Sequence, residues 1–201
     1  MTRAIACVAL CAASATAAPY TERQAAAAQP APAAPAAQPA PPPFVDPATV
    51  RPKGRAEDVG SIDAIVAAVY DVISGPAGPR DWDRFKSLLL PECRFMPMGN
   101  RPDGQEIYRA MDADGYIERA GPNFLKQGFF ESGVSNRVDQ FGRIAHVFST
   151  YESRHEKSGE PFARGINSMQ LVKLGTRWWI AAIMWDAERP GVTIPDKYLT
   201  R

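Results

Sequence analysis

The sequence predicts an α+β domain in which three N-terminal helices pack on a curved antiparallel sheet around an apolar pocket. Two observations support this fold class. Between residues 61 and 127, apolar side chains recur at helical spacing in three segments, and after Gly128 they alternate with the two-residue period of strands. Helices followed by a run of strands are typical of α+β domains. The helices would close one face of the sheet and leave a cavity between the two layers.

Two segments of different composition precede this domain. Residues 1–17 combine a positively charged start, a short apolar stretch and small final residues, which is typical of a cleaved export signal. Bulky Leu10 before Cys11 argues against a lipoprotein signal. Residues 18–57 are rich in alanine and proline, so we expect a disordered, semi-stiff tether that could also dock a partner. We expect the domain to span residues 58–201 of a periplasmic or secreted protein.

Composition and motifs argue against several classes of partner. The net charge of +1 and the lack of any block of like charges argue against nucleic-acid binding. The apolar stretch near the start of the chain is too short to span a membrane. Because the sequence has no His-x-x-x-His, Cys-x-x-Cys, Gly-x-Gly-x-x-Gly or P-loop motif, we expect neither a metal nor a nucleotide cofactor. After export only Cys93 would remain, which excludes an internal disulfide.

The individual elements follow from local signals. Each predicted helix begins at a side chain that can cap it and continues with apolar residues three and four positions apart. The caps are Ser61, Asp81 and either Asp112 or Asp114. Pro122 would kink or divide the third helix. The predicted strands are residues 93–98, 129–138, 143–154, 162–173 and 177–187. Gly165, a lone glycine inside a strand, predicts a bulge or a close approach of another backbone.

The last predicted strand is apolar on both faces. Trp179 and Trp185 share one face, whereas Trp178 and Met184 share the other. A strand with this pattern is buried on both sides. Since the helices can cover only one face, we predict that a second copy of the chain covers the other, which gives a homodimer through the sheet.

The order and spacing of several segments resemble the NTF2-like superfamily and, within it, the SnoaL-like domain family. The resemblance extends over residues 60–187. It is carried by Val69-Tyr70 in the first helix, the Pro-Glu-Cys-Arg-Phe step at residues 91–95, and strand segments 145–152, 164–172 and 175–180. It implies a cone-shaped α+β barrel with a deep pocket, often dimeric, in a family of cyclases, isomerases, dehydratases, binding modules and transport adaptors.

The resemblance also suggests a catalytic tyrosine. Ketosteroid-isomerase-like members use a tyrosine of the first helix together with pocket carboxylates, and Tyr70 is similar in position to that tyrosine. Its phenol could donate a hydrogen bond to a developing oxyanion, or it could be a core tyrosine satisfied by the backbone. Met96 stands where those members carry the base aspartate, so their mechanism is in doubt here. We expect Met96 to contact the ligand instead.

Polar residues on otherwise apolar strands are the remaining candidates. His146 could face the pocket as a general base, or it could be a satisfied structural histidine. Asn167 must bond a neighbour or line the pocket, because an unpaired buried amide costs about 1–3 kcal/mol. Arg164 could pair with Glu152 across two strands or bind a ligand carboxylate. Trp185 is expected to contact the ligand.

Two functions therefore stay open. The first is a small-molecule binding protein or cofactor-free enzyme for an apolar or carboxylate-bearing ligand, carrying out isomerisation, dehydration or cyclisation. In this reading His146 is the base, Tyr70 the oxyanion donor, and Asn167 positions the ligand. The second is a non-enzymatic interaction or dimeric scaffold module of the cell envelope, which the missing carboxylate at Met96 and the apolar sheet face favour.

Overall fold

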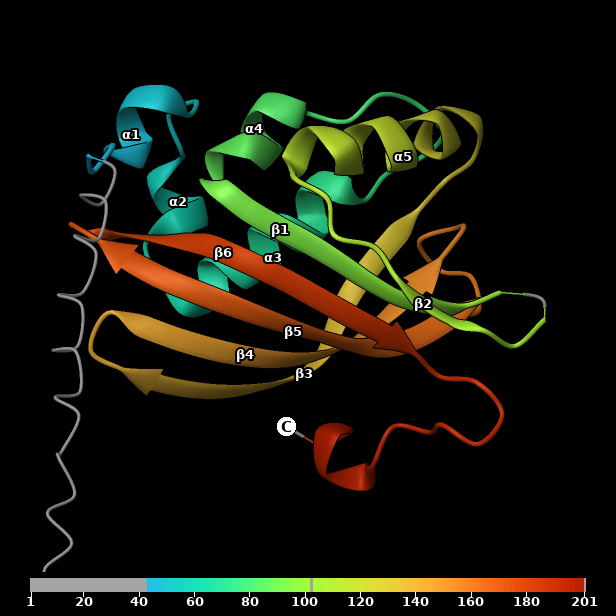
Figure 1. Ribbon diagram of the computed structural model, residues 1–201. Coiled ribbons are helices and arrows are strands. Elements are labelled where there is room, and N and C mark those ends of the chain that lie inside the picture. Colours follow the sequence, from blue (N-terminus) through green and yellow to red (C-terminus); the bar gives the residue numbers. More distant parts are fainter. Residues whose placement is uncertain (1–42, 102, 201) are drawn as a thin grey trace, which may run out of the picture. The chain divides into compact units, whose positions relative to one another are not determined.

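A curved, unclosed sheet of six strands organises the structure. The computed structural model describes residues 43–101 and 103–200 (Figure 1), so the expected export signal and most of the expected tether lie outside the described residues. The strands are β1 (Leu89–Asn100), β2 (Glu106–Tyr108), β3 (Phe130–Phe141), β4 (Ile144–Arg154), β5 (Ala163–Leu174) and β6 (Arg177–Ala187). They lie in the order β2-β1-β6-β5-β4-β3. Strands β3 to β6 form the antiparallel meander expected after Gly128.

The sheet is mixed, so the prediction of a wholly antiparallel sheet is wrong at one pair. β1 runs parallel to β6, with Phe95 opposite Ile183, and its other edge pairs with β2 in the antiparallel direction. Parallel neighbours need a long connection between them, and here the whole segment from β2 to β5 separates β1 from β6 in the chain. The alternation of apolar and polar residues in β1 predicts a strand, but it carries no information about which distant strand pairs with it.

The three main helices lie at the positions that their capping residues indicate. They are α3 (Ile62–Ile73), α4 (Trp82–Ser87) and α5 (Ala113–Lys126). The side chains of Ser61, Asp81 and Asp112 accept hydrogen bonds from the backbone N–H groups three residues later. Pro122 lies within α5 without dividing it. Because α5 follows β1 and β2 in the chain, the three helices do not form one N-terminal set.

The folded unit begins before residue 58, where the sequence analysis placed the end of the tether. Two short helices, α1 (Pro47–Val50) and α2 (Ala56–Val59), precede α3, and the unit starts at Pro43. Arg51, between them, donates hydrogen bonds to the carbonyl oxygens of Leu90 (3.0 Å) and Pro91 (3.2 Å). No helix within residues 43–101 and 103–200 has both the length and the apolar character to cross a bilayer.

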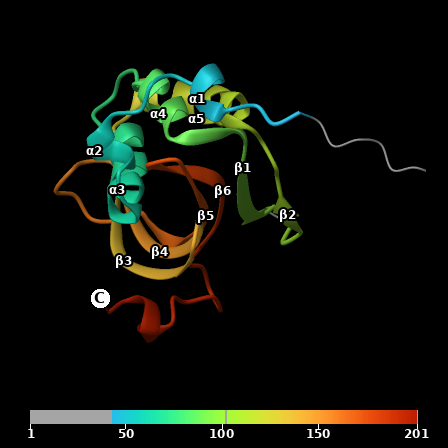
Figure 2. The same cartoon turned by 90° about the vertical axis from the view of Figure 1, so that its left-hand side faces the viewer.

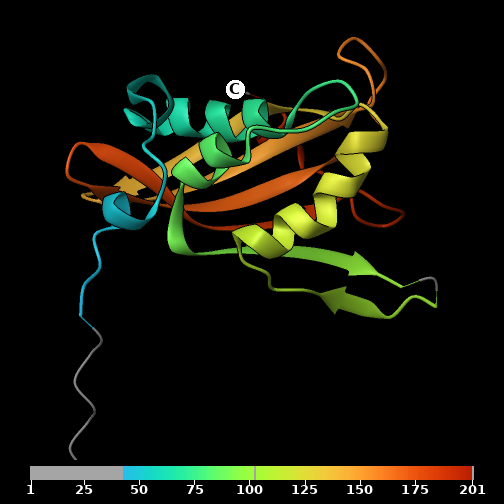
Figure 3. The same ribbon diagram turned by 90° about the horizontal axis from the view of Figure 1, so that it is seen from above.

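The helices and the C-terminal segment lie on opposite sides of the sheet. Viewed along the strands, α3, α4 and α5 lie on the concave side (Figure 2), and α5 runs beside β1 (Figure 3). The 3-10 helix η1 (Asp196–Tyr198) lies on the convex side, where the Tyr198 carbonyl oxygen accepts a hydrogen bond from Thr150. The Tyr198 ring packs 4.9 Å from that of Phe148.

The convex side bears on the predicted homodimer. Trp178 and Trp179 of β6 are both buried within the chain itself, and the Arg177 guanidinium lies 3.6 Å from the Trp179 ring centroid. Further along β6, Met184 is 42% exposed and Ile144 of β4 is 59% exposed. Only part of the apolar pattern in β6 therefore calls for another cover, and the homodimer through the sheet stays a prediction.

Gly165 confirms the expected close approach and gives a first test of the packing. A Cβ at this position would lie 2.3 Å from the carbonyl oxygen of Asp186 and 2.6 Å from the hydroxyl of Tyr151. Gly165→Ala should therefore lower the free energy of unfolding by about 1–3 kcal/mol, as overpacking does. Urea unfolding measures this, and Gly159→Ala is the matched control, because its Cβ meets Glu156 at an ordinary 3.4 Å. Equal midpoints for the two variants would contradict the described packing.

Candidate functional site

A partly open cavity of about 210 Å³ lies between the helices and the concave face of the sheet. Its walls are mainly apolar and come from both layers. They include Val69, Ile73, Phe85, Phe95, Met169 and Ile183. Four polar side chains, Tyr70, Glu131, Ser153 and Asn167, reach the same space. A mostly apolar cavity with a few convergent polar groups is the usual form of a small-molecule site.

Tyr70 projects from α3 into the cavity. Its hydroxyl accepts a hydrogen bond from the Asn167 amide nitrogen at 3.1 Å and lies 2.7 Å from the Ser149 Oγ. Both partners are side chains, so the expectation of a hydroxyl satisfied by backbone does not hold. Burial raises the pKa of Tyr70 well above its usual range. The hydroxyl therefore keeps its proton and can act as a hydrogen-bond donor.

Glu131, on β3, brings an ionisable carboxyl to the same cavity. One oxygen accepts a hydrogen bond from the Ser153 Oγ at 2.7 Å, and the other lies 3.5 Å from the Asn167 amide nitrogen. Burial raises the pKa of Glu131 to about 7, although the bonds from Ser153 and Asn167 lower it in part. No ion pair involves this carboxyl among the residues that the structure describes.

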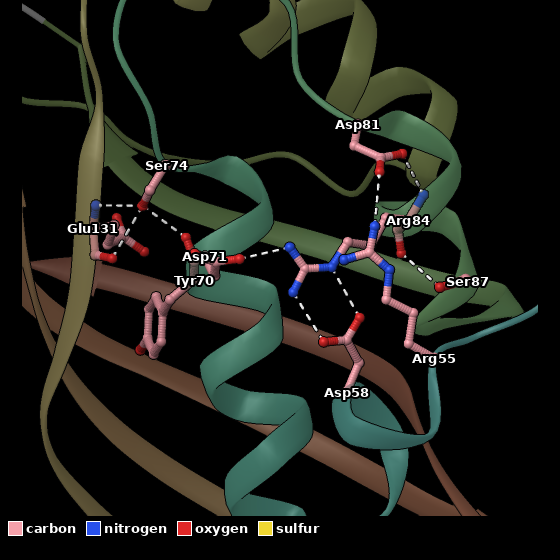
Figure 4. A network of polar contacts seen from close by, with 9 residues as sticks. All are labelled: Arg55, Asp58, Tyr70, Asp71, Ser74, Asp81, Arg84, Ser87 and Glu131. Carbon is pink, nitrogen blue, oxygen red and sulfur yellow. Dashed lines mark hydrogen bonds and ion pairs between the residues drawn. The ribbon is translucent and has the colours of Figure 1, made fainter.

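Two contacts fix Tyr70 and Glu131 relative to each other. The Asn167 amide nitrogen donates toward both groups, so the carboxyl and the phenol lie on either side of one amide. Ser74, at the end of α3, accepts a hydrogen bond from the Glu131 backbone N–H at 2.9 Å and donates to the Tyr70 carbonyl oxygen at 2.7 Å (Figure 4). Helix α3 and strand β3 are therefore attached to each other at the site.

Two further tyrosines complete the polar lining. The side chains of Tyr116 and Tyr151 both line the cavity. Burial raises the pKa of each well above its usual range, so both stay neutral. The cavity thus presents one titratable acid among neutral donors.

His146 lies on the opposite side of the sheet from this cavity. Its Nε2 atom is 2.9 Å from the Ser168 Oγ, and its ring packs 5.7 Å from that of Phe148. Successive residues of β4 alternate between the faces, so Ser149 and Tyr151 point inward while His146 points outward. The structure therefore brings Tyr70 and Asn167 together and separates them from His146, the expected base.

Of the other three residues expected to contact the ligand, one lines the cavity and two do not. Trp185 lines the cavity. Arg164 forms the alternative cross-strand pair, with its Nε 3.2 Å from a Glu152 oxygen, and it also approaches Glu188. Met96 alternates with Phe95, whose ring lines the cavity, and is itself outside that lining. Neither Arg164 nor Met96 is thus placed for the expected ligand role.

Glu131 is the residue that the sequence analysis missed. A signal was present, since a single acid follows Phe129 and Phe130 at the start of a predicted strand. In that strand Glu131 falls on the same alternation as Phe129, which also lines the cavity. Side chains two residues apart in a strand point to the same face, so an acid two residues after an aromatic side chain that lines the cavity indicates a carboxyl that faces the interior.

Comparisons with known proteins concern the fold. No protein-family model and no curated protein matches the sequence. A protein of unknown function with a cystatin-like fold from Nostoc punctiforme is similar at a TM-score of 0.50 and 7% identity, over 63% of this chain and 88% of that one. An NTF2-like protein from Silicibacter pomeroyi gives a TM-score of 0.42 at 13% identity, over 63% and 92%.

A putative scytalone dehydratase from Novosphingobium aromaticivorans gives 0.40 at 14% identity, over 54% of this chain and 71% of that one. The likeness is one of fold alone. At a TM-score of 0.50, the Nostoc protein supports a cystatin-like fold for this chain, whereas the NTF2-like superfamily and the SnoaL-like family stay resemblances of the sequence. Activity must therefore be argued from the site. Among the described residues, no three His, Cys, Asp or Glu side chains lie close enough together to hold a metal ion.

Proposed function

We propose that the cavity binds a small apolar carbonyl compound and that Glu131 moves a proton on it without a cofactor. One observation carries this proposal. A carboxyl whose pKa burial raises to about 7 shares the Asn167 amide with the neutral hydroxyl of Tyr70. A general base is most effective when its pKa is close to the working pH. The proposal includes export through residues 1–17.

The step is an isomerisation by proton transfer. Ionised Glu131 removes a proton from the carbon next to the carbonyl, and the electron pair of that C–H bond moves into the enolate. Tyr70 donates a hydrogen bond to the enolate oxygen, which is the charge that develops in the transition state. The Ser149 hydroxyl can donate to Tyr70, and this leaves the Tyr70 proton free for the ligand. In a β,γ-unsaturated carbonyl compound this enolate extends over the double bond, and Glu131 returns its proton to the γ-carbon, so the double bond moves into conjugation and nothing is consumed.

An exchange reaction tests this function without knowledge of the natural substrate. In D₂O, the protein should accelerate the exchange of the α-protons of 2-tetralone, an apolar bicyclic ketone, as followed by ¹H NMR. The rate should rise with pH through about 7, because only ionised Glu131 is a base. Glu131→Gln should lose about 100-fold or more of the acceleration.

His146→Gln is the matched control, since His146 lies on the convex face and should leave the rate unchanged. Loss of the rate in His146→Gln but not in Glu131→Gln would overturn the proposal.

A non-enzymatic interaction module is the second candidate. The exposed apolar side chains of Met184 and Ile144 on the convex face favour it. The two candidates differ in the cavity, because an interaction module needs no titratable acid there. Wild-type protein that leaves the exchange rate of every apolar ketone tested at its uncatalysed value would favour this second function.

A further inference from the structure

A second space lies beside the cavity along α5. This space, of about 400 Å³, shares Tyr116, Phe129 and Trp185 with the inner cavity. The inner cavity alone is smaller than the roughly 300–1,000 Å³ of usual ligand sites, whereas the two together fall within that range. A ligand larger than a compact ring system would need both spaces, and it would pass between the three shared side chains with its reactive end at Glu131.

The outer space differs from the inner one in its polar groups. Arg119 and Asn123 are four residues apart and lie on one face of α5, and Gln127, which follows the end of this helix, lines the same space. Opposite them, the His155 ring stacks on Phe162 at 4.2 Å. The walls are still largely apolar, but the rim offers hydrogen-bond donors and a cation.

Beyond this rim lies a shallow surface with a second arginine. Arg109 and Arg119 both line it, and it has Arg119 and Met111 in common with the outer space. Neither arginine forms an ion pair with any acid in residues 43–101 and 103–200, although Glu118 lies on the same surface. Guanidinium groups bind carboxylates and phosphates through paired N–H donors.

We infer that the ligand is an elongated amphiphile, whose apolar body fills both spaces and whose anionic end, a carboxylate or a phosphate, lies at Arg109 and Arg119. This inference rests on the proposed function for the reactive end alone. The sequence predicted that Arg164 would bind a ligand carboxylate, but Arg164 is paired with Glu152. We assign this role to Arg109 and Arg119 instead. Glu131 is unsuited to the anionic end, because a second negative charge beside it would be unfavourable.

Isothermal titration calorimetry of the whole chain tests the anionic end with three probes: decanoate, decyl phosphate and 1-decanol. At low salt, one or both anions should bind about fivefold to tenfold more tightly than the alcohol, and the preference should shrink at high salt. The double variant Arg109→Gln/Arg119→Gln should abolish the preference and leave the affinity for decanol unchanged. Arg143→Gln, in the β3–β4 turn, is the control and should keep it.

The outcomes separate this inference from the proposed function. An unchanged preference in the double variant, or equal affinities of anions and alcohol for the wild type, would overturn the anionic end. No binding of any ten-carbon probe, with 2-tetralone exchange intact, would overturn the extended site and leave the proposed function standing. Arginine-dependent binding of decanoate or decyl phosphate without ketone exchange would support the inference and count against the proton transfer.

Discussion

Replacing Arg84 by methionine should lower the free energy of unfolding by about 3–5 kcal/mol. Arg84, on α4, binds both oxygens of Asp58 through its Nε (2.8 Å) and Nη2 (2.9 Å) atoms (Figure 4). Asp58 is 5% exposed, so loss of Arg84 leaves a buried carboxylate without its partner. The further contact to Asp71 adds little, because that side chain is 68% exposed.

The pH dependence of this effect has a defined sign. The hydrogen bonds from Arg84 lower the pKa of Asp58, so this stabilisation is present above the ordinary aspartate pKa of about 4 and is lost as the pH falls through the lower folded value. Arg84→Met should therefore differ most from the wild type near neutral pH. Adding Asp58→Asn to Arg84→Met should recover part of the loss, because no buried charge then remains.

Urea unfolding at neutral pH measures the change, and Arg55→Met is the matched control. Arg55 approaches Asp81 at 3.6 Å, but both side chains are about half exposed, so we expect a loss of at most about 1 kcal/mol. Equal losses in Arg84→Met and Arg55→Met would show that the pair with Asp58 does not hold α2 to α4.

Glu131→Gln should change how stability depends on pH. Burial raises the pKa of Glu131 from an ordinary value of 4.5 to about 7. Between these two values the folded protein keeps a proton that the unfolded chain has released. The free energy of unfolding of the wild type should therefore fall as pH rises through this window, by about 3 kcal/mol from this group. The glutamine variant lacks that loss and should be more stable than the wild type at pH 8.

Thermal or urea unfolding of both proteins across pH 4 to 9 tests this sign. Glu156→Gln, at an exposed position in the β4–β5 loop, is the control and should follow the wild-type curve. A constant difference between Glu131→Gln and the wild type at all pH values would mean that the carboxyl titrates alike in the folded and unfolded states.

Features set by neighbouring residues could be predicted from the sequence. Ser61, Asp81 and Asp112 cap their helices because a capping side chain acts within three residues. Asn167, a polar residue on an apolar face, had to bond a neighbour or line the pocket, and it does both. The close approach at Gly165 could also be predicted locally, because a residue without a side chain leaves room for another backbone.

Features that depend on the orientation of a whole strand could not be predicted. His146 lies on a strand with apolar residues on both faces, so its pattern did not show which face meets the helices. Glu131 reaches the cavity because β3 pairs with β4 in the register that places Glu131 opposite Ser153. The parallel pairing of β1 with β6 has the same origin, because a partner distant in the chain leaves no local signal.

The ionisation of Glu131 inside the cavity is the centre of this account, and its titration tests it most directly. Carbon-13 NMR of protein labelled at the glutamate carboxyl carbons, with the Glu131 signal assigned from its absence in Glu131→Gln, should show a midpoint near pH 7. A midpoint near 4.5 would mean that water solvates this carboxyl freely, and the proposed proton transfer would lose its base.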